Sequence, residues 1–141
     1  MYSREQISSI ARKLAKKYKT NNPLELSEWL NVDVFIFPLG NIYGFYKYTH
    51  RNKQIYVNSD LDYRNKIIVC SHELGHAVLH PRENCPFLKA YTCSFEDRLE
   101  LEANLFGTYL LSCSIDEGFM TYEQIINVFN VAEEIAAYKI M

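Results

Sequence analysis

Cysteine is scarce in this chain and shows no pairing pattern. Only four of the 141 residues are cysteine, and Cys70, Cys85, Cys93 and Cys113 include no C-x-x-C pair. This spacing excludes a small scaffold held together by disulfides and favours a reduced, cytoplasmic setting. A second metal site built from His80, Cys85 and Cys93 is a minor alternative, and Cys70 is expected to be a core residue.

Long hydrophobic runs and an excess of one charge are also missing. No segment is long and apolar enough to span a bilayer, and the N-terminus lacks the apolar region of a secretory signal. The net charge of −2 does not indicate a nucleic-acid binder. The basic stretch Arg12–Lys19 is interpreted as the solvated face of an amphipathic helix. The length fits one domain over residues 1–141.

The most informative feature present is His72-Glu73-Leu74-Gly75-His76, an H-E-x-x-H motif with apolar flanks. Residues four apart lie on one face of a helix, so His72 and His76 can direct two imidazole nitrogens at one ion. In a hydrolytic zinc site of this kind, Glu73 takes a proton from the metal-bound water. A surface helix with two chance histidines is the plainer alternative. It is disfavoured because burying unpartnered imidazole and carboxylate groups in an apolar stretch is costly.

A zinc hydrolase needs a third protein ligand. The pattern H-E-x-x-H-x-x-G-x-x-H fails, because Leu79 and Arg82 occupy the positions of its glycine and last histidine. On a straight helix His80 would lie about 6 Å beyond His76, too far to share a tetrahedral ion. We expect His80 at the helix end, facing the terminal carbonyls before Pro81. A carboxylate on a later helix is the remaining source.

That later helix, expected over Ser94–Ser114, carries Glu100 and Glu102. At 100° per residue the two lie about 200° apart, so only one of them can face the metal. Glu100 is preferred, because Asn104 one turn later can hydrogen-bond a ligand and Ala103 leaves room for the first helix to approach. The other glutamate is expected to be solvated.

These segments resemble the ImmA/IrrE-type metallopeptidases. The specific part of the resemblance comprises the run His72–Pro81 and the later string Glu100-x-x-Ala103-Asn104-x-Phe106. Weaker matches upstream are Asn22–Leu26, Leu39–Tyr46 and Ile55–Asn58, which extend the similarity over about Tyr18–Ile140.

The resemblance implies an α+β fold: a mainly helical, zincin-like (gluzincin) metallopeptidase domain with a small three-stranded β-sheet. It implies Zn²⁺ ligands at His72, His76 and Glu100, and a catalytic Glu73. It also implies a function, the zinc-dependent cleavage of a helix-turn-helix transcriptional repressor encoded nearby on a phage or mobile element. In that reaction Glu73 is the general base for a metal-activated water.

Hydrophobic periodicity and the start signals of helices predict the secondary structure. The predicted helices and strands are, in chain order, the helices Ser3–Tyr18 and Pro23–Leu30, the strands Val32–Phe37, Tyr43–Tyr48 and Gln54–Val57, and the helices Leu61–His80 and Ser94–Ser114. The first strand is expected to be buried, and a polar turn around Arg51–Lys53 is expected to join the other two.

Two further capping-box starts predict a C-terminal helical pair, Tyr122–Phe129 and Val131–Lys139, packed on the domain within about 121–140. Such a pair resembles a DNA-binding helix-turn-helix. Glu133 and Glu134 stand at the start of its second helix, however, where negative charge repels DNA. Packing against the metal helices is therefore the preferred interpretation.

Two other functional classes stay open beside the endopeptidase. One is a non-catalytic module that binds and sequesters the repressor, which an intact Glu73 disfavours because binding needs no general base. The other is a hydrolase of a non-peptide amide. Tyr46, Tyr48 and His50 are weak candidates for a donor to the oxyanion. An extended substrate would add itself to an exposed edge of the small sheet.

Overall fold

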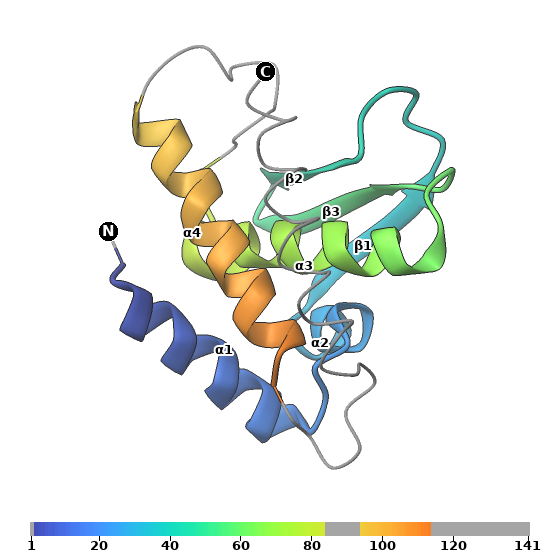
Figure 1. Cartoon of the computed structure of the whole chain (residues 1–141). Coiled ribbons are helices and arrows are strands. Elements are labelled where there is room, and N and C mark those ends of the chain that lie inside the picture. The colour runs from blue at the N-terminus through green and yellow to red at the C-terminus, as the bar shows by residue number, and fades with distance from the viewer. Residues whose placement is uncertain (1, 84–93, 114–141) are drawn as a thin grey trace.

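The computed structural model describes residues 2–83 and 94–113, which form four helices and one three-stranded sheet (Figure 1). The elements in chain order are α1 (Arg4–Tyr18), α2 (Pro23–Trp29), β1 (Val32–Phe37), β2 (Gly44–Thr49), β3 (Asn52–Asn58), α3 (Tyr63–Leu79) and α4 (Ser94–Leu111). The predicted α+β class is confirmed, and the predicted ends of the elements differ from the observed ones by at most three residues. In this described part of the chain, no helix combines the length and the hydropathy that crossing a membrane requires.

Side-chain caps explain where the first three helices begin. Ser3 and Gln6 form a capping box at the start of α1, in which the Ser3 Oγ accepts from the Gln6 N–H at 3.1 Å. Asn22 caps α2, and Pro23 occupies a position where no N–H is needed. Asp62 caps α3 by accepting a hydrogen bond from a backbone N–H three residues later. These polar residues fix the entry into each helix.

The strand order is β1-β3-β2, with β1 parallel and β2 antiparallel to the central β3. Ile55 and Val57 of β3 are fully buried in the core. The prediction of a buried first strand is wrong, because β1 is an edge strand whose Phe35 and Phe37 are 38% and 44% exposed. Both rings pack on Tyr56 of the neighbouring strand instead of entering the core.

The turn between β2 and β3 lies one residue earlier than predicted. His50 and Arg51 both have positive φ, at 51° and 64°, and the flanking Thr49 and Asn52 pair with each other. This is the backbone of a two-residue hairpin, which matches the twist of the strands it joins. The residues after the turn therefore belong to β3.

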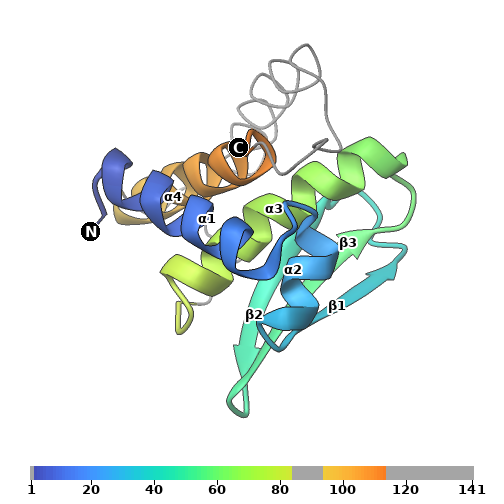
Figure 2. The same cartoon turned by 90° about the horizontal axis from the view of Figure 1, so that it is seen from below.

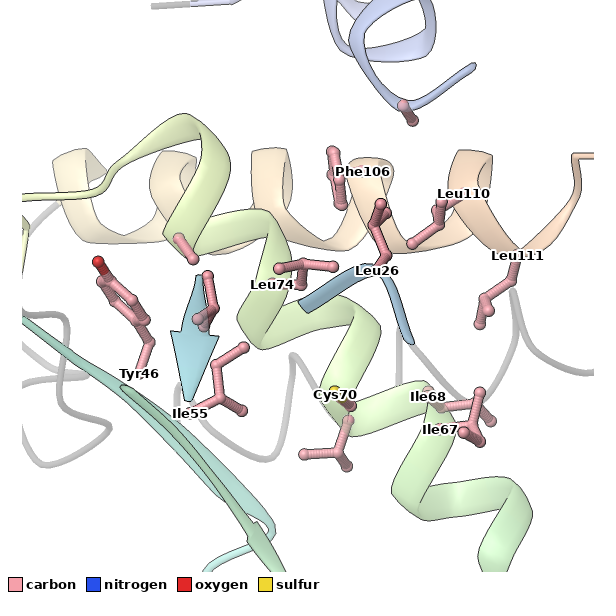
Figure 3. Close-up of a cluster of buried hydrophobic side chains, with 14 of the residues drawn as sticks. Leu26, Tyr46, Ile55, Ile67, Ile68, Cys70, Leu74, Phe106, Leu110 and Leu111 are labelled. Atoms are coloured by element: carbon pink, nitrogen blue, oxygen red, sulfur yellow. The ribbon is translucent and has the colours of Figure 1, made fainter. Parts of the chain in front are cut away.

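The elements form layers around α3. The sheet covers one side of α3, and α4 followed by α1 covers the other (Figure 2). Apolar side chains from all of these elements meet in one core, part of which Figure 3 shows. Its largest fully buried members include Ile7, Leu26, Ile55, Ile67, Ile68, Leu74, Phe106, Leu110 and Leu111.

The backbones of α3 and α4 touch where the two helices cross. A Cβ added to Gly75 would lie 2.8 Å from the carbonyl oxygen of Ala103 and 2.9 Å from its Cα. A Cβ added to Gly107 would lie 2.7 Å from the Ser71 Oγ. The prediction that Ala103 leaves room for the first helix is thus confirmed. The close crossing brings Glu100, one turn before Ala103, against the histidines of α3.

We expect Gly75→Ala to destabilise the fold by about 1–3 kcal/mol, because the new methyl group meets backbone that no side-chain rotation can move. Gly107→Ala is the matched comparison and should cost less, since the nearest atom there is a hydroxyl oxygen. Denaturant unfolding of the metal-free proteins measures both. A Gly75→Ala protein as stable as wild type would show that the helices do not need this contact.

Three expectations concern other parts of the chain. The helical pair at 121–140 lies outside the described residues, as do Cys85 and Cys93 of the alternative second metal site. Cys70 is fully buried in α3, as predicted for a core residue, and burial raises the pKa of its thiol to about 12.

Candidate metal centre

Helix α3 carries the H-E-x-x-H motif inside the molecule. His72, Glu73 and His76 are each at most 2% exposed. The two imidazole rings lie 5.0 Å apart between centroids and are nearly perpendicular, as expected for side chains one turn apart. Each of the three residues offers a ligand atom within 4.8 Å of the others. Two imidazoles and a carboxylate therefore share one buried space.

Glu100 of α4 enters the same space from the neighbouring helix. Its Oε2 lies 2.7 Å from the Nε2 of His72 and 3.0 Å from the Nε2 of His76. The Glu100 side chain is itself only 8% exposed. The same Glu100 oxygen thus faces both histidines, and each ring turns its Nε2 toward it.

This group of atoms suits zinc. Two imidazole nitrogens and one carboxylate oxygen are donors that zinc accepts, so His72, His76 and Glu100 would fit the ion. Burial lowers the pKa of His76, although the hydrogen bond to Glu100 partly opposes the shift. The imidazole is therefore held neutral, the form that binds a metal.

The two carboxylates nearest the histidines differ in position. Glu100 contacts both Nε2 atoms, whereas Glu73 adjoins His72 in the chain and offers its oxygen from within 4.8 Å. The Glu100 oxygen is therefore the better candidate ligand. Glu73, 1% exposed, lies beside the group, where a general base would be needed.

Glu102 and His80 lie where the sequence did not lead us to expect them. The prediction of a solvated second glutamate is wrong, because Glu102 is 4% exposed and its Oε1 lies 2.7 Å from the Nε2 of His80. The His80 ring also turns its Nδ1 to within 3.2 Å of the Nδ1 of His76. His80 stands at the C-terminal end of α3, as predicted, but its ring faces His76 and Glu102 and not the terminal carbonyls, contrary to the prediction. His72, His76 and His80 are evenly spaced along one helix face. This pattern could have indicated that His80, like the other two, contacts an acidic side chain.

The predicted hydrogen bond from Asn104 to a ligand is not formed. The Oδ1 of Asn104 and the Nδ1 of His72 are both buried, and neither has a hydrogen-bond partner within residues 2–83 and 94–113. Among residues 2–83 and 94–113, His76 has a partner at its Nδ1 and His72 has none.

The structure disfavours Tyr46 as a donor to an oxyanion. Tyr46 is 4% exposed, its hydroxyl donates to the Pro81 carbonyl oxygen at 2.5 Å, and burial raises its pKa. His50 lies exposed at the hairpin turn, where its Nδ1 is 3.0 Å from the Thr49 Oγ1. Tyr48 is partly buried on the same strand as Tyr46. None of the three is a strong candidate.

Comparison with known proteins places this site in a wider group. The family described as IrrE N-terminal-like domain (Peptidase M78) matches residues 28–141, which include every candidate residue above. The chain is 50% identical to the Uncharacterized immunity region protein 2 of Bacillus phage phi105, over 74% of this chain and 67% of that protein. It is 29% identical to the Metallopeptidase ImmA of Bacillus subtilis (strain 168), over 99% of this chain and 87% of that protein.

Proposed function

The chain belongs to the Peptidase M78 family, and from this premise we propose that it is a cytoplasmic, zinc-dependent endopeptidase that cleaves a helix-turn-helix transcriptional repressor. Family membership supports a metallopeptidase. The names of the two relatives, an immunity region protein and Metallopeptidase ImmA, support a substrate that controls phage or mobile-element genes.

The proposal rests mainly on one observation: a single Glu100 oxygen contacts the Nε2 atoms of both His72 and His76. We assign these three residues as the zinc ligands and Glu73 as the general base. A bound zinc would supply a Lewis acid that polarises the scissile carbonyl and lowers the pKa of a water molecule.

The protein side chains have the other roles in the proposed reaction. Burial favours the neutral form of His76, while Glu100 contributes the negative charge. Glu73 accepts the proton of the attacking water and delivers it to the amine that leaves as the C–N bond breaks. With Glu73 at 1% exposure, little bulk water competes for that proton.

The sheet offers an edge for the substrate. β2 is an edge strand, and it packs beside β3 on the helix that carries His72 and His76. The Tyr46 hydroxyl of β2 donates to the carbonyl oxygen of Pro81, two residues after the end of α3. An extended segment of the repressor would add to β2 through main-chain hydrogen bonds. The other edge, β1, packs mainly on α2 and β3.

Removing zinc tests this function directly. We expect purified protein to cut the helix-turn-helix repressor encoded beside it, to lose this activity with a chelator, and to regain it with added zinc. Zinc should also stabilise the fold, by about 2.7 kcal/mol when free zinc is 100 times its dissociation constant. Cleavage that continues at full rate in the chelated protein would contradict the proposal.

A further inference from the structure

We infer that His80 and Glu102 form a hydrogen-bonded pair that positions His76 for metal binding. The inference rests on the proposed function, because it takes His76 as a zinc ligand. Neither His80 nor Glu102 is among the proposed zinc ligands, so they are positioning residues that act through His76.

The contacts form an unbroken series leading away from the candidate metal centre. The Nδ1 of His76 lies 3.2 Å from the Nδ1 of His80, and the Nε2 of His80 lies 2.7 Å from the Oε1 of Glu102. The second oxygen of Glu102 accepts the backbone N–H of Tyr2 at 3.0 Å. The series thus connects α3, α4 and the segment that leads into α1.

The chemistry of the atoms fixes the direction of each hydrogen bond. A His76 that binds metal through Nε2 carries its proton on Nδ1 and donates it to His80. His80 accepts at Nδ1, so its own proton is on Nε2 and points at the Glu102 carboxylate. Glu102 then accepts twice, from His80 and from Tyr2. With a metal on the Nε2 of His76, this assignment gives every contact of the series a donor and an acceptor.

The surroundings hold this pair in place. His80 and Glu102 are 6% and 4% exposed, so water competes weakly for their hydrogen bonds. The backbone N–H of His80 donates to the His76 carbonyl oxygen at 2.8 Å.

A ligand supported through its second ring nitrogen is oriented before the metal arrives and is a stronger base. Loss of such a partner typically lowers metal affinity by about 10- to 100-fold. His72 lacks a partner of this kind among the described residues. His76 is therefore the ligand whose metal affinity should depend on such support.

The test compares zinc affinity, measured by competition with a chelator, in wild type, His80→Phe and Glu102→Gln. We expect about 10- to 100-fold weaker binding for His80→Phe and a smaller loss for Glu102→Gln, which keeps one acceptor for His80. NMR of the zinc-loaded, ¹⁵N-histidine-labelled proteins should show a His76 Nδ1 proton that is protected from exchange in wild type. That protection should be lost in His80→Phe.

Tyr46→Phe is the control, because it removes the hydrogen bond to Pro81 and leaves the His80–Glu102 pair intact. Its zinc affinity should match wild type. An equal loss in Tyr46→Phe would overturn the inference in favour of general loosening around the end of α3. Wild-type affinity in His80→Phe would overturn it and leave the proposed function standing, whereas a wild-type protein that binds no zinc would overturn both. If His80→Phe does not fold, Glu102→Gln decides.

Discussion

Replacing Glu100 with alanine should lower zinc affinity by about 10²- to 10³-fold. Four-ligand zinc sites in small proteins have apparent binding energies of about 10–16 kcal/mol, so one ligand accounts for roughly a quarter of that range. Glu100 is also the only one of the three proposed ligands that carries a negative charge. Its loss should leave His72 and His76 without the oxygen that both now face.

Glu102→Ala is the matched control, since it removes an equally buried carboxylate two positions away on α4. Because Glu102 acts through His80, we expect its loss to be near 10-fold, at the low end for a group that supports a ligand. Competition with a chelator under identical conditions ranks the two variants. The opposite order, with zinc lost only in Glu102→Ala, would show that the wrong glutamate has been assigned.

Replacing Glu73 with glutamine should preserve zinc binding and reduce repressor cleavage by about 10²- to 10⁴-fold, the usual contribution of a general base. Glutamine has nearly the shape of glutamate but cannot accept the proton of the attacking water. The buried position favours a neutral amide at least as well as a carboxylate, so the fold should persist.

Metal content and cleavage rate of purified Glu73→Gln are the measurements. Retained zinc with wild-type cleavage would remove Glu73 from the mechanism. Loss of zinc together with cleavage would show that Glu73 is itself a ligand.

The arrangement of His72 and His76 was predictable because it depends only on the spacing of residues within one helix. Four-residue spacing places both rings on one helix face, and the 200° between Glu100 and Glu102 required that the two diverge. The spacing left open which glutamate faces the histidines, and Glu100 was preferred because of Asn104 and Ala103. In the structure Glu100 contacts both histidines, although the expected Asn104 bond is not formed.

The surroundings of Glu102 and His80 were not predictable in the same way. Glu102 is buried because His80 and the Tyr2 backbone reach it, and Tyr2 lies 100 residues away in the sequence. The apolar run of β1 likewise reads as a buried strand, whereas its exposure depends on which strand lies at the edge of the sheet. Both errors arise where the three-dimensional neighbour, and not the residue itself, decides burial.

The proposed function of this chain is cleavage of a helix-turn-helix repressor. The most direct test is to co-express it with the helix-turn-helix repressor encoded beside it and to record the intact mass of that repressor, using wild type and Glu73→Gln. We predict a discrete repressor fragment with wild type alone, whose mass identifies the cleaved bond. A repressor that stays intact with both forms while bound to this chain would contradict the claim and establish a sequestering module instead.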